Sequence, residues 1–380
     1  MTHRERWLNV MHFQPVDRVP DEEFGYWDDT FPTWHQQGLP REIDSNQKAD
    51  LYFGFAPRAD VPVHYGLEPG FERKVLEERG EQLLIQDEHG ALCLIHASGR
   101  SSIPHFLEFR LKDRAAWERD FKPRLDPEDP KRLPSQAELD KLKARWANRD
   151  YPLGISIGSL YGWIRDWAGF EGAAMMVRDD PALIEEIMET ITQIITRAIA
   201  WVAPQVQLDF GAGWEDMCYN MGPMISPRDF ARLMVPRYRR ITDLLRQHGC
   251  DVIYTDCDGN INQLVPLWLE GGVNGMFPVE VAAGTDPLPL RDKYGRRVLL
   301  LGGVNKRALI AGKEGIRKEI ERIEPYVREG GWIPHVDHRV PPDVTFANYL
   351  YYLALKRDTF GIPEPAPWEE RRPAGWGPPQ

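Results

Sequence analysis

The stretch CDVIYTDCDGNINQLVPLWLEGGVNGMFPVE (residues 250–280) places two short apolar runs on either side of a helical segment. The first run is CDVIYTD (250–256) and the second is GVNGMFPVE (272–280). Short apolar runs bounded by turn residues are typical of buried strands, and a helix between two such strands lets them lie parallel. The stretch therefore predicts one strand–helix–strand unit of an α/β sheet.

The same alternation extends along the chain in both directions. From Leu153 onward six apolar runs alternate with helical segments, and two further strands fit into the first 110 residues. The six runs span residues 153–158, 206–212, 250–256, 272–280, 298–304 and 332–338. Eight such units close a (β/α)8 TIM barrel, which is the predicted fold. An open doubly wound sheet is the alternative, and it is disfavoured because no Gly-rich phosphate turn follows an early strand.

Two other segments complete the predicted organisation. Residues 74–97 form two alternating runs joined across Glu88-His89-Gly90, which predicts an N-terminal β-hairpin insertion that decorates the barrel. A helix over 226–249 is predicted from the cap at Ser226 and the closing Gly249. Residues 1–361 are expected to form a single domain. The Pro-rich residues 362–380 are expected to form a C-terminal tail on the surface or on a partner subunit.

The composition argues against several classes of function. The chain has 47 Lys and Arg against 58 Asp and Glu, a net charge of −11, and a surface this acidic repels nucleic acid. No apolar run approaches the roughly 20 residues that cross a membrane, and the N-terminus lacks the apolar core of a signal peptide. We therefore expect a cytoplasmic protein. The four cysteines form no CxxC pair and are expected to be reduced thiols.

Polar side chains follow five successive predicted strands. Catalytic residues of parallel barrels sit at the carboxyl ends of the strands, so these side chains form the candidate site. The candidate catalytic residues are Glu215, Asp216, Asp256, Asp258 and His338. Glu280 and Lys306 follow the remaining two strands and are candidate substrate-binding residues.

Asp256 and Asp258 are two residues apart, so on an extended strand both carboxylates point to the same side. Two such carboxylates repel each other unless they share a proton, a cation or a basic neighbour, which makes the pair a candidate for metal binding or acid–base catalysis. The alternative is an Asx turn that caps the next helix. Glu215 and Asp216 could form a solvated corner instead, His338 a salt-linked surface histidine, and Lys306 a helix start.

At these residues the sequence resembles the uroporphyrinogen decarboxylase superfamily, which includes the decarboxylase and the methylcobamide:coenzyme M methyltransferases. The resemblance covers nearly the whole chain. The motifs that carry it are RERWLNVMHFQPVDRVP (4–20), IGSLYGWIRDWAGFE (157–171), WEDMCYNMGPMISPRDF (214–230), TDCDGNI (255–261), GMFPVEVAAGTD (275–286) and HVDHRVPPDVTFANY (335–349). The resemblance implies a (β/α)8 barrel with a deep cleft at the strand ends.

The sequence departs from both branches of that superfamily. The region that holds an Arg-rich motif in the decarboxylases reads FGYWDDTFPTW (24–34) and contains no arginine, although His338 falls at their functional histidine. A porphyrinogen with eight carboxylates would then meet aspartates and aromatic rings, which electrostatics opposes. In the zinc methyltransferases a His-x-Cys pair and a later Cys bind the metal. Asp256, Asp258 and His338 stand at or near those positions.

The function expected from this resemblance is a methyltransferase that moves a methyl group from a small O- or N-methylated substrate to a corrinoid protein. Zinc would be held by Asp256, Asp258 and His338. The expected substrate-binding residues are Tyr26, Trp27, Trp163, Tyr219, Glu280 and Lys306. A decarboxylase or lyase acting on a tetrapyrrole or another carboxylated substrate is the alternative, and a non-catalytic ligand-binding barrel is the second. Analogy with the superfamily suggests a homodimer.

Overall fold

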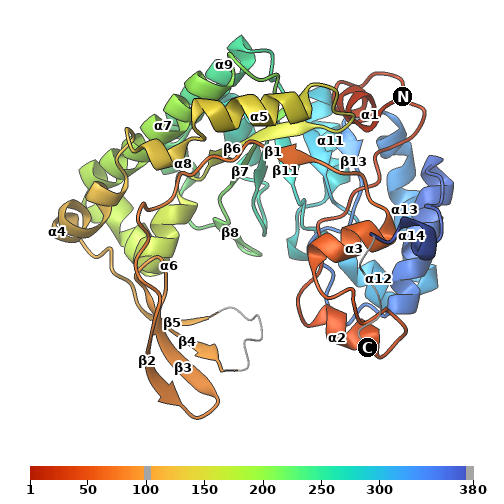
Figure 1. Cartoon of the computed structure of the whole chain (residues 1–380), viewed down its shortest axis with the longest axis horizontal. Coiled ribbons are helices and arrows are strands. Elements are labelled where there is room, and N and C mark those ends of the chain that lie inside the picture. The colour runs from red at the N-terminus through yellow and green to blue at the C-terminus, as the bar shows by residue number, and fades with distance from the viewer. Residues whose placement is uncertain (98–103, 374–380) are drawn as a thin grey trace.

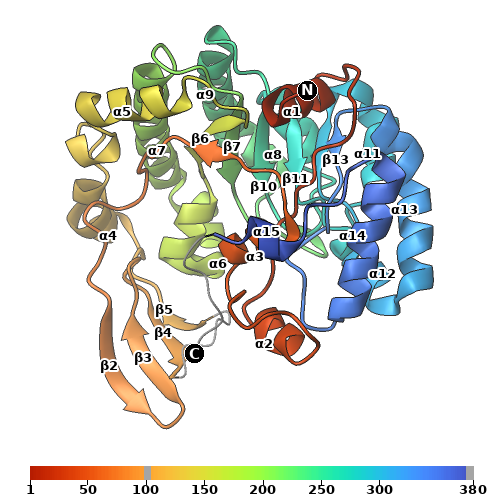
Figure 2. The ribbon, with the colours of Figure 1, turned by 45° about the vertical axis from the view of Figure 1, so that its right-hand side comes forward.

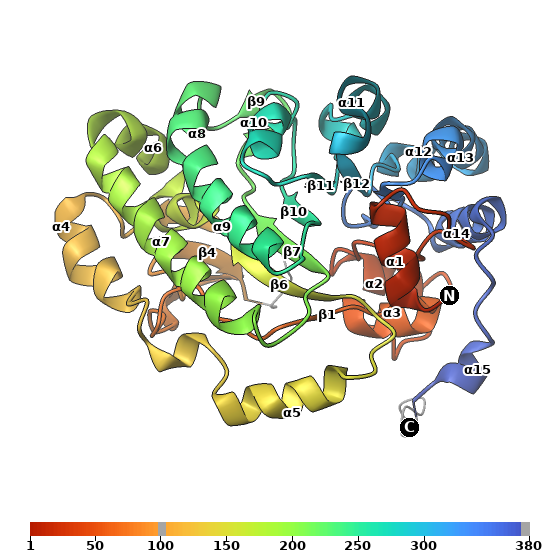
Figure 3. The ribbon, with the colours of Figure 1, turned by 90° about the horizontal axis from the view of Figure 1, so that it is seen from above.

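A curled, seven-stranded parallel sheet forms the centre of the computed structural model, which describes residues 1–97 and 104–373 (Figure 3). Its strand order is β1-β6-β7-β10-β11-β12-β13, and every neighbouring pair is parallel. The strands are β1 (Ala59–Asp60), β6 (Leu153–Gly158), β7 (Phe210–Trp214), β10 (Ile253–Asp256), β11 (Gly275–Phe277), β12 (Leu299–Leu301) and β13 (Trp332–Ile333). Six of them overlap the apolar runs of the sequence, which confirms a parallel α/β fold of the TIM-barrel type.

An eighth strand does not form among the described residues, although eight were expected. At the place between β13 and β1, Tyr26 makes a single parallel bridge to Val340. Trp27 donates a backbone hydrogen bond to the Val340 carbonyl at 3.2 Å, and Val340 donates one to the Gly25 carbonyl at 2.9 Å. The segment around Tyr26 therefore lies against the carboxyl side of β13 without extending into a ladder.

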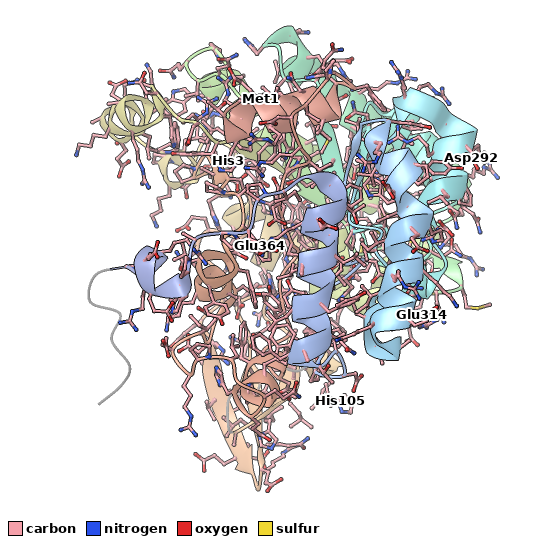
Figure 4. All side chains as sticks on the ribbon, turned by 90° about the vertical axis from the view of Figure 1, so that its right-hand side faces the viewer. Met1, His3, His105, Asp292, Glu314 and Glu364 are labelled. Carbon is pink, nitrogen blue, oxygen red and sulfur yellow. The ribbon has the colours of Figure 1, made fainter. Side chains whose placement is uncertain are left out.

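Helices cover the outside of the sheet (Figure 3). The longer ones are α5 (Gln136–Trp146), α6 (Gly162–Asp179), α7 (Pro181–Val202), α9 (Val235–Gln247), α13 (Lys313–Arg328) and α14 (Phe346–Phe360). The shorter ones are α2 (Thr30–His35), α3 (Asn46–Phe53), α4 (Arg114–Ala116), α8 (Pro227–Leu233), α10 (Val265–Glu270), α11 (Pro287–Tyr294), α12 (Lys306–Ala311) and α15 (Trp368–Arg371). Figure 4 shows α13, which begins next to Glu314, running side by side with α14.

The predicted single helix over 226–249 is wrong in one respect. It begins after Ser226, whose side chain accepts from the Asp229 amide, but it breaks at Met234 into α8 and α9. Pro236 explains the break, because proline cannot donate a backbone hydrogen bond and hinders the residue before it from adopting the helical conformation.

Four strands between Lys74 and Glu108 form an antiparallel sheet that extends away from the parallel sheet (Figures 1 and 2). Its strands are β2 (Lys74–Arg79), β3 (Gln82–Gln86), β4 (Leu92–His96) and β5 (His105–Glu108). The turn between β3 and β4 lies at the predicted Glu88-His89-Gly90. Two strands were expected over 74–97 and three are present there, because the first alternating run is divided at Gly80, which adopts a φ of +64°. The fourth strand, β5, lies beyond the predicted stretch. A separate two-stranded sheet is formed by β8 (Cys218–Tyr219) and β9 (Gly222–Pro223), which follow β7 in the chain.

The amino-terminal helix α1 (His3–Met11) packs against residues near the starts of the strands. Trp7 and Val10 are almost completely buried in a cluster with Phe210, Leu299 and Ile333. This packing covers the amino ends of the strands.

Part of the predicted tail lies on the body of the protein. Arg371 of α15 donates hydrogen bonds to the carbonyl oxygens of Leu51 and Tyr52 at 2.5 and 2.8 Å. Residues 374–380 of that tail are outside the described part of the chain. Within the described residues no helix has the length and apolarity to traverse a lipid bilayer. All four cysteines are free and buried, as expected.

Candidate active site

A cavity of about 1000 Å³ opens at the carboxyl ends of the strands. Its polar lining includes Asp216 after β7 and Asp258 after β10, together with Arg165 and Asp166 from α6. Trp27 and Tyr219 are among its aromatic lining residues. Two of the predicted catalytic residues and two of the predicted substrate-binding residues therefore face one cavity.

Asp216 is held in an unusual backbone conformation, with a φ of +43°. Non-glycine residues rarely adopt positive φ, and such residues are frequent at functional sites. Arg165 donates to the Asp216 carbonyl oxygen, and its guanidinium lies 3.9 Å from the Asp216 carboxylate. Burial, followed by the negative charge of Asp258, raises the pKa of Asp216 to about 6.

Asp256, the last residue of β10, carries the most perturbed carboxyl of the cluster. Burial raises its pKa well above the ordinary value, and the charges of Asp216 and Asp258 raise it further. Its Oδ1 atom is buried and has no hydrogen-bond partner among the described residues. Asp256 therefore holds its proton more tightly than an isolated aspartic acid does.

Asp258 and His338 form a hydrogen-bonded pair, with 3.0 Å between Oδ2 and Nε2. The His338 ring stacks on Trp27 at a centroid distance of 5.4 Å, and Phe24 meets its edge at 5.7 Å. Burial disfavours the imidazolium, but the hydrogen bond and the charge of Asp258 outweigh it and raise the pKa of His338. The second side-chain atom of each residue, Asp258 Oδ1 and His338 Nδ1, is buried and makes no hydrogen bond within the described part of the chain.

Glu215 lies next to Asp216 but faces the interior. Its carboxylate accepts hydrogen bonds from the backbone amides at the start of α6 and from two hydroxyl groups. The donors are Leu160 N, Tyr161 N, Gly162 N, Ser159 Oγ and Tyr238 Oη. Glu215 therefore anchors α6 to the end of β7, and it is not among the residues that line the cavity.

Glu280 and Lys306 pair with each other at 2.6 Å, beside the loop that follows β10. Glu280 also accepts from the Gly259 amide at 2.9 Å. Tyr26 is fully buried, with its hydroxyl 2.7 Å from that of Tyr349, and Trp163 packs against Trp214. These four predicted substrate-binding residues support the walls of the site without lining the cavity.

Arg165, Asp166 and Arg58 are site residues that the strand pattern did not reveal. The first two lie on α6, inside the motif at 157–171, so a search restricted to strand ends passes over them. Arg58 precedes β1 and donates to the Tyr254 hydroxyl at 3.3 Å. Its positive charge opposes the rise in the pKa of Asp256.

The three predicted zinc ligands lie in one region, but they do not form a metal-binding group. Within residues 1–97 and 104–373, no set of three or more His, Cys, Asp or Glu side chains is placed to hold a metal ion. The Nε2 atom of His338 bonds to Asp258 instead. The donor set as arranged does not fit a three-ligand zinc site.

Comparisons with known proteins point to one family. The model of the family described as Uroporphyrinogen decarboxylase (URO-D) matches residues 112–356. A uroporphyrinogen decarboxylase from a Nostoc species is 23% identical over 181 residues, which is 47% of this chain and 49% of that protein. One from Trichormus variabilis is 23% identical over 177 residues, 46% of this chain and 47% of that protein. The chain spans about half the length of the curated relatives it matches.

A solved structure supports the fold. A methyltransferase from Methanosarcina mazei superposes with a TM-score of 0.57 at 17% identity, covering 94% of this chain and 98% of that one. At this level of identity the superposition establishes a shared fold, and the reaction has to be argued from the site.

Proposed function

The chain belongs to the uroporphyrinogen decarboxylase (URO-D) family, and from that premise we propose that it is a methyltransferase acting on a small O- or N-methylated substrate. The proposed acceptor is a corrinoid carried by a separate protein. Support for methyl transfer within the family comes from the likeness to a methyltransferase and from the chemistry of the cavity.

The observation that carries the proposal is a group of three carboxyl residues: Asp216 and Asp258 line the cavity, and Asp256, at the end of β10, has a pKa that burial and their charges raise well above its ordinary value. When a methyl group leaves oxygen, the C–O bond breaks and its electron pair stays on oxygen. Asp256 can supply the proton that this oxygen takes up, while the methyl group passes to the electron pair of the acceptor. An N-methylated donor carries a positively charged nitrogen. This nitrogen would lie among the carboxylates and balance their charge in place of the proton.

The pair formed by Asp258 and His338 suits the positioning of the donor. His338 is fixed by Trp27 on its face and by Asp258 at Nε2, so its orientation is set before a substrate binds. No step of the proposed reaction uses a metal ion. Zinc stays a proposal from the resemblance, to be tested by elemental analysis of protein purified without chelator.

The test is a methyl-transfer assay with free cob(I)alamin as the acceptor, in which formation of methylcobalamin is followed by absorbance. Methoxylated aromatic compounds and quaternary amines serve as donors. Asp256→Asn is expected to lower the rate by about 100-fold or more, since general acid–base groups contribute factors of that order. Asp243→Asn, an equal change of charge at an exposed position of α9, is the matched control and should leave the rate unchanged. Absence of methylcobalamin with every donor would contradict the proposal.

Decarboxylation is the second candidate, because the two curated relatives are uroporphyrinogen decarboxylases. The cavity opposes a polyanionic substrate, since five carboxylates and only two basic side chains occur among its described lining residues. Anaerobic incubation with uroporphyrinogen decides between the two candidates. Production of coproporphyrinogen would establish the decarboxylase.

A further inference from the structure

We propose that the cavity selects an organic cation, a small partly apolar molecule with a quaternary or protonated amine. This inference rests on the proposed function, because it names the substrate class of the same site. It narrows the choice between O-methylated and N-methylated donors to the cationic, N-methylated class.

The charges that line the cavity are strongly unbalanced. The acidic lining residues are Glu108, Asp166, Glu171, Asp216 and Asp258. The two basic ones are already paired: Lys112 bonds to Glu108, and Arg165 bonds to Asp166 at 3.0 Å. An excess of negative charge inside a concave, partly desolvated site attracts cations and repels anions.

The walls around these carboxylates are aromatic and apolar. Phe170 and Tyr219 meet edge to face at 5.7 Å, and both rings are exposed at the cavity, to 42% and 52%. Phe109 and Met224 add further apolar surface. Aromatic ring faces attract alkylammonium groups through their quadrupole, so these walls suit the methyl groups of such a cation.

The carboxyl cluster supplies the second half of the argument. Asp256 and Asp258 each keep a buried oxygen that has no hydrogen-bond partner in residues 1–97 and 104–373. Asp216 and Asp258 present partly exposed carboxylates to the cavity. Repulsion among three carboxylates is relieved either by a proton or by a cation. A cation bound in the cavity would therefore relieve this repulsion.

Several charged groups face this cluster from the surrounding elements. Arg165 and Asp166 approach from α6, and Arg58 approaches from the segment before β1. His338 and Arg339 approach from the segment after β13. Arg339 also lies over the ring of Trp27 at 5.8 Å, with His338 stacked on the same ring. The Trp27 ring therefore already contacts Arg339 and His338. The wall formed by Phe170 and Tyr219 is the aromatic surface that remains for a ligand.

The experiment is isothermal titration calorimetry of the full chain with choline and with its uncharged isostere, 3,3-dimethylbutan-1-ol. The two molecules have nearly the same shape and differ in charge, so the ratio of their affinities measures what the positive charge contributes to binding. Choline is expected to bind at least about tenfold more tightly.

Asp258→Asn is expected to weaken choline binding by about tenfold, and Asp243→Asn should leave it unchanged. Asp216→Asn serves in its place if thermal melting shows that the first variant fails to fold. Equal affinity for choline and the isostere, or no choline binding at all, would overturn the inference. The titration contains no methyl acceptor, so a chain that binds choline but transfers no methyl group would refute the proposed function alone.

Discussion

Glu215 and Asp216 show how far two neighbouring residues can differ in role. The backbone turns at Asp216, with its φ of +43°, so that one carboxylate enters the interior and the other reaches the cavity. Glu215 meets five donors and anchors α6, whereas Asp216 meets Arg165 and the negative charge of Asp258. Sequence spacing places both residues at a strand end, but only the local φ decides which of them faces a substrate.

Asp216 should also make the stability of the protein depend on pH. Its folded pKa of about 6 lies above the ordinary 3.8, so between these pH values the folded state binds more protons than the unfolded state. The free energy of unfolding therefore falls as pH rises from about 4 to about 6. Because the side chain is 41% exposed, solvent screens part of this effect, and about 1 kcal/mol is expected.

Asp216→Asn removes the titrating group, so its stability relative to the wild type should increase by that amount between pH 4 and pH 7. Urea unfolding of both proteins at the two pH values measures the difference. Asp243→Asn controls for the loss of one charge, because Asp243 is 66% exposed. A relative stability that is independent of pH would show that Asp216 is not perturbed in the folded state.

At the scale of elements, the sequence predicted what depends on local spacing. The alternation of apolar runs located six strands of the parallel sheet, since each run is buried on both faces. It did not locate the division of residues 74–87 at Gly80 or the break before Pro236. Each of these interruptions is caused by one residue inside a segment whose hydrophobic pattern is otherwise uniform. The strand pattern did not predict Arg165 for a different reason, because Arg165 reaches the site from a helix and not from a strand end.

The kink in α6 is the element that shapes one wall of the cavity. Gly169 interrupts the helix with a φ of +73°, and a Cβ atom at this position would lie 2.4 Å from the Phe109 ring. Both Gly169 and Phe109 line the cavity. Only glycine combines the left-handed backbone with such a close approach.

Gly169→Ala is expected to lower the free energy of unfolding by about 1–3 kcal/mol, through backbone strain and displacement of Phe109. Ligand binding should weaken with it, because the wall moves. Gly172→Ala is the matched control for stability in the same helix: Gly172 lacks a positive φ, and alanine favours the helix. Urea unfolding of both variants and choline titration of Gly169→Ala provide the measurements. Equal stability of the two variants would show that the kink tolerates a side chain.

In the whole molecule, the two ends of the parallel strands have different roles: one end is packed against a helix, and the other forms the candidate site. The amino ends of the strands are packed by α1, and the carboxyl ends open into the acidic cavity. Figure 1 shows α1 and the four-stranded sheet at opposite ends of the molecule. The sequence predicted this polarity from polar residues after apolar runs. It could not predict which polar residues share the cavity, because that depends on contacts between segments as distant as Trp27, Asp216 and His338.

This separation predicts that stability and binding can be changed independently. Trp7 is 2% exposed and packs on residues at the amino ends of the strands, so Trp7→Ala should lower the free energy of unfolding by about 3–5 kcal/mol. Leu8→Ala, a change at a half-buried neighbour, should cost less. The affinity of the folded Trp7→Ala protein for choline should stay within about twofold, since the cavity lies at the other end of the strands. Urea unfolding and calorimetry test both statements, and a joint loss of stability and affinity would mean that the two ends are coupled.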